Sequence, residues 1–199
     1  MVNRQSSIIG ITGGIGSGKS LVCGLLEERG IPVFYTDDEA KLEMRENQQI
    51  HRELIDLLGP EAIDSEGAPV KAVLADYICR GQEYADNINN IVHPRVRERM
   101  HRWIKAQHKN CVAIESALLF ESGFNADCTV TVTVTAPLET RVIRIMRRDG
   151  ITRDKALEWI SLQMPQEQKA ALADYTIIND AITPLTPQIE NLRVQGICH

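Results

Sequence analysis

The sequence predicts an α/β fold in which a parallel sheet is flanked by helices, with a helical insertion and a helical lid. Apolar, β-prone runs alternate with helical patterns along the 199 residues, which is typical of parallel sheets. A glycine-rich motif separates the first strand pattern from the first helix pattern. Residues 37–108 carry helical patterns without a convincing strand, and this stretch is too long for a simple crossover helix.

The first strand, loop and helix carry the strongest motif. Ser7–Thr12 is a short apolar strand pattern, and Lys19–Arg29 has leucine and valine at helical spacing. Between them, residues 13–20 read G-G-I-G-S-G-K-S, the G-x-x-x-x-G-K-S pattern of a phosphate-binding P-loop. The alternative is a glycine-rich turn that happens to precede a lysine. Because strand, loop and helix are in register, we expect a P-loop NTPase-type sheet.

Each residue type in this loop suits a nucleoside triphosphate. Successive backbone N–H groups form an anion nest, and the following helix adds the positive end of its dipole. Glycine permits positive φ and close approach of a phosphate. Lys19 would contact the β- and γ-phosphates, and the Ser20 hydroxyl would bind Mg²⁺. The expected nucleotide-binding residues are Gly14, Ile15, Gly16, Ser17, Gly18, Lys19, Ser20 and Leu21.

Further strand patterns follow along the chain. Pro32–Thr36, Cys111–Ser116 and Tyr175–Ile178 are short and β-prone. Cys128–Thr135 alternates threonine with valine, which predicts a strand whose faces differ, one covered by a helix and one nearer an edge.

The insertion between the second and third strands is expected to be helical. Its helical pieces are Asp38–Glu46, Gln49–Leu58, Pro69–Arg80, Glu83–Val92 and Pro94–His108. Breaks are expected at Gly59-Pro60, Gly67 and His93-Pro94. Ligands of open α/β sheets bind at the carboxyl edge of the sheet, so an insertion there is placed to hold a second substrate.

A helical stretch from Leu138 to Leu172, interrupted at Gly150 and Pro165, is the expected lid. Phosphoryl transfer uses mobile cations that close over the developing charge, which gives an arginine-rich lid a function. The alternative is a solvated helix face. The arginines are Arg141, Arg144, Arg147, Arg148 and Arg153.

Composition and charge restrict the function classes. The net charge of −5 argues against general affinity for nucleic acid or anionic membrane. No apolar run approaches the roughly 20 residues of a membrane span. The N-terminal residues lead straight into the first strand and leave no room for a signal peptide, so we expect a cytoplasmic protein. The five cysteines lack a C-x-x-C pair and are expected to be free thiols or small buried hydrophobes.

The layout favours a small-molecule kinase. The guanine-reading N-K-x-D of GTPases is absent, as is the signature loop of ABC-type ATPases. Asp37 directly follows the second strand pattern, where a carboxylate would accept or orient the proton of an acceptor hydroxyl. The alternative is that Asp37 or Asp38 caps the next helix. Glu115, at the end of the third strand, would lie near the metal or face water.

Along nearly its whole length the chain resembles dephospho-coenzyme A kinases. The P-loop alone is shared by thousands of proteins, but the ordered series with L-L-F-E, H-P and Q-M-P is much more specific. The matching segments are I-I-G-I-T-G-G-I-G-S-G-K-S (8–20), G-I-P-V-F-Y-T-D (30–37), I-V-H-P (91–94), E-S-A-L-L-F-E (115–121), R-I-M-R-R-D-G (144–150), Q-M-P-Q-E-Q-K (163–169) and A-D-Y-T-I-I-N-D (173–180).

The resemblance implies transfer of the γ-phosphate of ATP, with Mg²⁺, to the ribose 3′-hydroxyl of dephospho-CoA, the last step of coenzyme A synthesis. It implies three parts: a nucleotide-binding core, a CoA-binding insertion and a lid. The core would comprise residues 1–36, 109–139 and 173–199, the insertion residues 37–108, and the lid residues 140–172.

The resemblance also assigns roles to the nucleotide side. Asp37 matches the catalytic base, and it acts together with Lys19. Arg144 and Arg148 match the lid arginines that meet the phosphates, with Arg144 counted as catalytic. Asn179 falls near the adenine of ATP.

On the acceptor side, His93 falls on the H-P histidine of the CoA-binding part; its alternative role is a helix-break residue before Pro94. Leu118 and Lys71 are the other expected contacts of dephospho-CoA. Lys71 stands where an arginine is frequent, and lysine lacks the bidentate fork of arginine. Further departures from the family pattern are Tyr35, Glu115, Leu21 and Trp159.

The sequence is compatible with two other functions. One is another nucleoside or metabolite kinase, and the other is an ATP-binding regulator whose chemistry is vestigial. Retention of Asp37 and Ser20 argues against the regulator. The expected state is a monomer or weak homo-oligomer.

Overall fold

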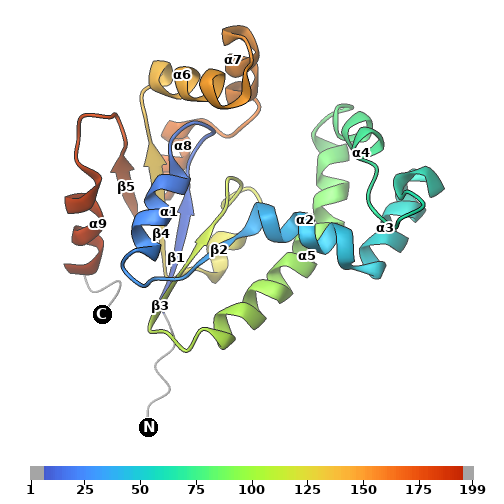
Figure 1. Ribbon diagram of the computed structural model, residues 1–199, viewed down its shortest axis with the longest axis horizontal. Helices are drawn as coiled ribbons and strands as arrows, with labels where there is room; N and C mark the ends of the chain where they lie inside the picture. Colours follow the sequence, from blue (N-terminus) through green and yellow to red (C-terminus); the bar gives the residue numbers. More distant parts are fainter. Residues whose placement is uncertain (1–6, 195–199) are drawn as a thin grey trace. The chain divides into compact units, whose positions relative to one another are not determined.

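The computed structural model describes residues 7–194, so Cys198 and the segment before Ser7 lie outside the described residues. The chain divides into two compact units, one of residues 1–35 with 107–199 and the other of residues 36–106 (Figure 1). The expected further division of the first unit into a core and a lid stays a prediction.

Within residues 7–194 the first unit holds a five-stranded parallel sheet in the order β2-β3-β1-β4-β5, which confirms the predicted fold class (Figure 1). Every predicted strand is present, with ends that move by two residues at most. The strands are β1 (Ser7–Thr12), β2 (Val33–Tyr35), β3 (Cys111–Glu115), β4 (Val130–Thr135) and β5 (Tyr175–Ile178).

Helices cover both faces of this sheet. The helical elements of the first unit are α1 (Lys19–Glu27), η2 (Phe124–Asp127), α6 (Leu138–Asp149), α7 (Arg153–Ser161), α8 (Gln166–Leu172) and α9 (Leu185–Val194). Ile9 and Ile11 of β1 pack with α1 and α9 in the main core. Gly10 faces the other side, where an added Cβ would lie 2.6 Å from Sγ of Cys128 and 2.9 Å from Cδ2 of Leu119. A side chain at this position would therefore require Cys128 and Leu119 to shift.

Strand β4 differs from its prediction. The strand lies between β1 and β5, and its threonines Thr131 and Thr133 are buried along with its valines. Thr131 is accommodated on this interior strand because Asp174 accepts a hydrogen bond from its hydroxyl at 2.8 Å. The expected face near an edge is therefore wrong, because the threonine–valine alternation does not reflect solvent exposure.

The second unit is helical, with α2 (Thr36–Glu46), α3 (Gln48–Leu58), η1 (Pro60–Ala62), α4 (Lys71–Ile78) and α5 (Gln82–Ala106). The breaks predicted at Gly59-Pro60 and Gly67 are confirmed, since both glycines have positive φ between helices.

The break predicted at His93-Pro94 is wrong, because α5 runs through Pro94. A proline inside a helix costs about 3 kcal/mol. The buried residues Ile88, Val92, Val96 and Met100 recur every four positions along α5. Each buried side chain of this size contributes about 1.5–3 kcal/mol, so together they outweigh the cost of Pro94.

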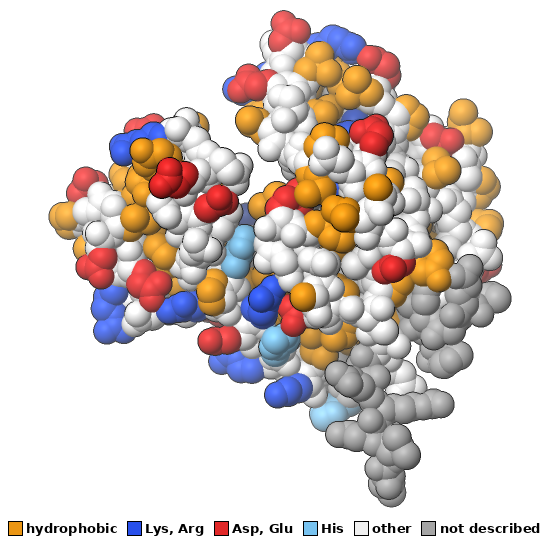
Figure 2. All heavy atoms as spheres, turned by 180° about the vertical axis from the view of Figure 1, so that it is seen from behind, with side chains coloured by type: hydrophobic (Ala, Val, Ile, Leu, Met, Phe, Trp, Pro, Cys, Tyr) orange, Lys and Arg blue, Asp and Glu red, His pale blue; other side chains and the backbone are white. Residues whose placement is uncertain are grey.

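The cysteines and the surface bear on the other expectations. Cys23, Cys79 and Cys128 are free thiols, whereas Cys111 is disulfide-bonded, so the expectation of free thiols is wrong for Cys111. Local spacing excludes only pairs close in sequence, and a disulfide joins cysteines that the fold brings together. On the face shown in Figure 2, acidic and basic side chains are interspersed, in keeping with a net charge of −5. Among residues 7–194, no helix combines the length and apolar character of a membrane span.

Candidate nucleotide-binding site

The glycine-rich loop lies at the carboxyl end of the central strand of the sheet. Ile11, near the end of β1, is paired with Glu115 of β3 on one side and Val132 of β4 on the other. From β1 the chain crosses to β2 beyond β3, and it later returns to β4 on the opposite side. The strand order therefore reverses at β1, which is the position where open α/β sheets bind ligands.

Three glycines of the loop have backbone conformations that favour glycine. Gly13 has φ 146°, Gly16 has φ 78° and Gly18 has φ 94°. Gly18 directly precedes α1, and an added Cβ would lie 2.0 Å from Nδ2 of Asn179. The loop thus leads into the amino end of α1, where the first backbone N–H groups have no partner within the helix.

The carbonyl groups at both ends of the loop accept hydrogen bonds from within it or from α1. Nζ of Lys19 donates to the Gly13 carbonyl at 2.8 Å, and the Ser17 amide donates to the Gly14 carbonyl at 3.1 Å. The Gly18 carbonyl accepts from the Leu21 amide at 3.1 Å, as in the first turn of a helix.

Side chains from outside the loop hold its central carbonyls. Arg144 on α6 donates to the carbonyls of Gly16 (3.3 Å) and Ser17 (3.2 Å). The Ser17 carbonyl also accepts from Nδ2 of Asn179 at 2.8 Å. Arg144 in turn donates to both oxygens of Asn179, at 3.1 Å and 3.2 Å. The Ile15 carbonyl accepts from Arg141, so every carbonyl from Gly13 to Gly18 is held.

The anchored carbonyls set the direction of the loop amides. A trans peptide is planar, so the N–H of the next residue points away from the anchored oxygen. The amides of Gly16, Gly18 and Lys19 follow anchored carbonyls, so the Gly16 amide points away from Arg141 and the Gly18 amide points away from Arg144 and Asn179. This orientation builds an anion nest at the start of α1.

Lys19 and Glu115 lie next to each other beside this nest. Oε1 of Glu115 is 3.9 Å from Nζ of Lys19, and the Glu115 side chain is only 10% exposed. The option that Glu115 faces water is therefore wrong. One turn further along α1, burial and the negative charges of Glu115 and Glu27 raise the pKa of the Cys23 thiol, which leaves it a neutral packing residue.

The arginines of residues 138–172 fall into two groups. Arg141 is buried against the loop and Arg144 holds the loop carbonyls. Arg148 is exposed and paired with Asp149 at 2.8 Å, and Arg153 is exposed and paired with Glu139 at 2.6 Å. The solvated-face interpretation thus fits the second group only. Arg148 is not brought to the loop, and its role toward the nucleotide stays a prediction.

Two polar residues near the site were not singled out from the sequence. Oε1 of Gln163 accepts a hydrogen bond from the Ile15 amide at 2.7 Å. Nζ of Lys169 is fully buried and donates to Oε1 of Glu121 at 2.8 Å and to the Ala117 carbonyl at 2.6 Å. Both residues belong to the Q-M-P-Q-E-Q-K segment. This segment contributes to the family resemblance in the sequence, but the sequence does not identify the hydrogen-bond partners of Gln163 and Lys169. Trp159 packs in an apolar cluster of α6 and α7, as its packing interpretation predicted.

The predicted acceptor-side residues of the second unit lie on three helices. Asp37 is exposed in the first turn of α2, so the helix begins earlier than predicted and Asp37 is inside it. Asp38 is paired with Lys41 at 2.7 Å rather than acting as a cap. Lys71 is exposed at the start of α4. His93 is half-buried in α5, and burial together with the charge of Arg97 lowers its pKa, against an opposing effect of Asp37.

Leu118, the fourth predicted contact of the acceptor, lies in the first unit. It belongs to the loop after β3, where its amide donates to Oγ of Ser116 at 3.3 Å. The same loop carries Ala117 and Glu121, the partners of Lys169.

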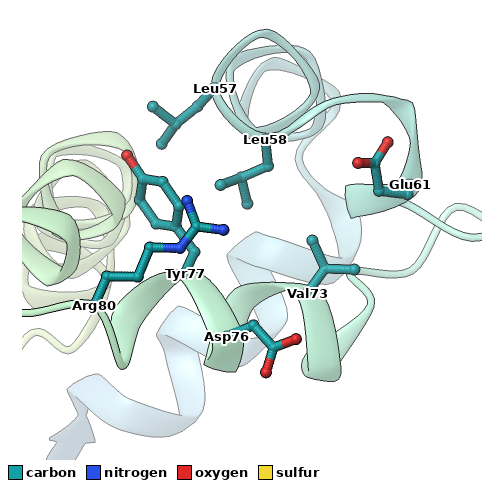
Figure 3. A pocket seen from close by; sticks show the side chains of 7 residues that line it. All are labelled: Leu57, Leu58, Glu61, Val73, Asp76, Tyr77 and Arg80. Carbon is teal, nitrogen blue, oxygen red and sulfur yellow. The ribbon is translucent and has the colours of Figure 1, made fainter.

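The second unit also contains a hollow of about 290 Å³ between α3, η1 and α4 (Figure 3). Its lining residues are Leu57, Leu58, Glu61, Val73, Asp76, Tyr77 and Arg80. The Arg80 guanidinium lies over the Tyr77 ring, 5.4 Å from its centroid. Because both signs of charge stand around the hollow, it favours neither an anionic nor a cationic ligand. Asp37, Lys71, His93 and Leu118 do not line it.

Comparisons with known proteins agree on one family. The sequence model of the family described as "CoaE: Dephospho-CoA kinase" matches residues 7–184. The dephospho-CoA kinase of Bacteroides fragilis is 44% identical over 187 residues, covering 92% of this chain and 90% of the relative.

Two solved structures are similar over almost the whole chain. The crystal structure of TT1252 from Thermus thermophilus has a TM-score of 0.80 and 34% identity, with 97% of each chain covered. A dephospho-CoA kinase from Campylobacter jejuni has a TM-score of 0.67 at 21% identity, covering 97% of this chain and 98% of that one, and this likeness concerns the fold.

Proposed function

This chain belongs to the dephospho-CoA kinase family, and from that premise we propose how its residues transfer the γ-phosphate of ATP to the ribose 3′-hydroxyl of dephospho-CoA. The observation that carries the proposal is the anchored loop. Its carbonyls from Gly13 to Gly18 are all held, which supports the amides of Gly16, Gly18 and Lys19 as the donors to a bound anion.

Stabilisation of charge is the task of the loop. The amides of Gly16, Gly18 and Lys19, together with the Lys19 side chain, would take up the negative charge that shifts among the β- and γ-phosphates during transfer. Leu21 would follow as the last nucleotide contact on α1. Arg144 and Asn179 hold the loop and would flank the nucleotide, with Asn179 near the adenine. Arg148 would approach the phosphates from the lid.

The Ser20 hydroxyl suits Mg²⁺. Ser20 is exposed in the first turn of α1, next to Lys19. Mg²⁺ takes oxygen ligands and is usually held by one or two protein groups together with phosphates and water, so a single exposed hydroxyl fits. When bound, the ion would neutralise phosphate charge.

The second unit would supply the acceptor side. Asp37 would accept or orient the proton of the 3′-hydroxyl as the oxygen attacks phosphorus. His93, Lys71 and Leu118 would contact dephospho-CoA, with His93 neutral because its pKa is lowered. In this proposal residues 37–108 bind CoA, residues 140–172 form the lid and the rest forms the nucleotide core. A cytoplasmic location and a monomeric or weakly oligomeric state complete the proposal.

An acceptor screen tests this function. The full chain would be given ATP and Mg²⁺ with dephospho-CoA, nucleoside monophosphates or shikimate, and ADP formation measured. We expect ADP with dephospho-CoA alone, together with a product heavier by one phosphoryl group. ADP formed with another acceptor would indicate a different metabolite kinase. No ADP with any acceptor would favour an ATP-binding regulator.

A loop variant is the control for this screen. Lys19→Ala removes the positive charge beside the phosphates, so turnover with dephospho-CoA should fall by orders of magnitude while the circular dichroism spectrum stays that of the wild type. Near-normal turnover in Lys19→Ala would contradict the role of the loop in charge stabilisation.

A further inference from the structure

One residue of the loop, Ile15, is held at three points by the segment that follows β4. Its amide donates to Oε1 of Gln163 at 2.7 Å, and its carbonyl accepts from Nε of Arg141 at 2.9 Å. Its side chain packs on the apolar cluster of α6 and α7, which contains Val142 and Ile145. Arg141 is on α6, and Gln163 lies between α7 and α8.

We propose that Arg141 and Gln163 are positioning residues that clamp Ile15 and thereby aim the Gly16 amide at the phosphates of the nucleotide. This inference rests on the proposed function, because it assumes that the loop binds a triphosphate. It adds two residues to which the nucleotide-binding motif gives no role.

Peptide geometry connects the clamp to the Gly16 amide. The Ile15–Gly16 peptide is trans and planar, so an Ile15 carbonyl fixed on Arg141 turns the Gly16 N–H in the opposite direction. The preceding peptide is fixed at both of its polar groups as well. Its N–H reaches Gln163, and its oxygen, that of Gly14, accepts from the Ser17 amide at 3.1 Å.

Close packing prevents these peptides from turning over. A Cβ added to Gly14 would lie 2.4 Å from Nη2 of Arg141, and one added to Gly16 would lie 2.8 Å from the Arg141 carbonyl oxygen. Arg141 therefore contacts three successive loop residues with its guanidinium and its backbone. The Arg141 residue is only 6% exposed, so water does not compete for its contact with the Ile15 carbonyl.

The clamp predicts a specific pattern of ligand binding. Gln163→Met keeps the length of the side chain and removes the acceptor of the Ile15 amide. This substitution should weaken the binding of ligands that carry phosphates, because only these ligands contact the Gly16 amide. We expect the Kd for ADP to rise about fivefold to tenfold, the worth of one hydrogen bond, and the Kd for adenosine to stay the same.

The experiment is calorimetric titration of the full-length chain with ADP and with adenosine, for wild type, Gln163→Met, Arg141→Met and the double variant. Gln168→Met is the matched control, because Gln168 is an exposed glutamine that takes no part in the clamp. Both single variants should raise the Kd for ADP. The double variant should raise it by less than the product of the two single fold-changes, because Arg141 and Gln163 both act on Ile15. Hydrogen exchange at the Ile15 amide should speed up in Gln163→Met and stay unchanged in Gln168→Met.

An unchanged Kd for ADP in Gln163→Met would overturn the inference, as would an equal loss of ADP and adenosine. Should Arg141→Met fail to fold, Gln163→Met decides the matter alone. Because ADP binding is measured without an acceptor, this result is independent of the acceptor screen. A wild type that binds ADP through the clamp and phosphorylates no dephospho-CoA would contradict the proposed function and leave the clamp standing.

Discussion

At the scale of single residues, Asp37 is the group proposed to act on the acceptor, and it has a sharp test. Asn in place of Asp37 keeps the shape of the side chain and cannot accept a proton. Asp37→Asn should therefore lower kcat about a hundredfold or more, with the Kd for ATP nearly unchanged. Steady-state kinetics and ATP titration measure the two quantities.

The outcome that would reassign Asp37 is a loss of ATP affinity in place of a loss of turnover. If ATP affinity collapsed in Asp37→Asn while turnover at saturating ATP stayed high, Asp37 would be a metal-binding residue rather than a base.

His93 predicts a dependence of stability on pH. Burial and Arg97 lower the pKa of His93 below its ordinary value of 6.5, against the opposing effect of Asp37. The unfolded state then binds a proton at a higher pH than the folded state does. The contribution of neutral His93 is complete above its unfolded pKa and is lost as the pH falls from there through the lowered folded pKa.

Urea denaturation measured between about pH 7.5 and pH 5 checks this sign. In the wild type the free energy of unfolding should decrease as the pH is lowered. His93→Gln should reduce the slope of the free energy of unfolding against pH. A slope that is as steep in His93→Gln as in the wild type would show that other groups cause it.

Residue types in the loop were predictable from the sequence, and their partners were not. The motif gives glycine, lysine and serine their positions because the phosphate nest needs them. Gln163, which accepts from the Ile15 amide, is 148 positions away, and Asn179, which donates to the Ser17 carbonyl, is 162 positions away. No local pattern encodes such contacts. Arg144 was predicted as a lid cation, and its bonds to the loop carbonyls come from the tertiary structure.

At the scale of elements, α8 is tied to the loop after β3 by one buried lysine. Lys169→Met removes the partner of Glu121 and of the Ala117 carbonyl. We expect a loss of about 2 kcal/mol in the free energy of unfolding, below the value for a fully buried pair because the Glu121 side chain is 25% exposed. Urea denaturation measures it.

Two further variants serve as controls for Lys169. Lys169→Met combined with Glu121→Gln should recover part of the loss, because no unpaired charge remains. Lys155→Met breaks an exposed pair with Glu158 and should change stability by less than about 0.5 kcal/mol. A loss in Lys169→Met no larger than that in Lys155→Met would refute the structural role of the buried pair.

The elements themselves were largely predictable. Alternating strand and helix patterns placed β1 and β5 at their observed bounds, because a short apolar run bounded by turn residues is typical of a buried strand. The error at Pro94 has a physical cause. Local preference argues for a break there, and the four buried residues along α5 outweigh it through contacts that the local pattern does not count.

At the scale of the whole molecule, the chain is organised in two compact units. Residues 36–106 lie between β2 and β3 in the sequence, and these two strands are paired with each other, so the insertion leaves the sheet continuous. The helical patterns predicted an insertion over residues 37–108, and the second unit of the structure comprises residues 36–106. The interior position of β4 was not predictable, since strand order depends on which strands pair and not on any one strand.

The central claim is that anchored carbonyls turn the loop amides toward the phosphates. The most direct test is a titration of the nitrogen-15-labelled full chain, followed through the backbone amide signals. The account predicts that ADP shifts the signals of Gly16, Gly18 and Lys19 strongly and that adenosine leaves them in place. Signals of these three amides that stay unmoved as ADP binds would contradict it.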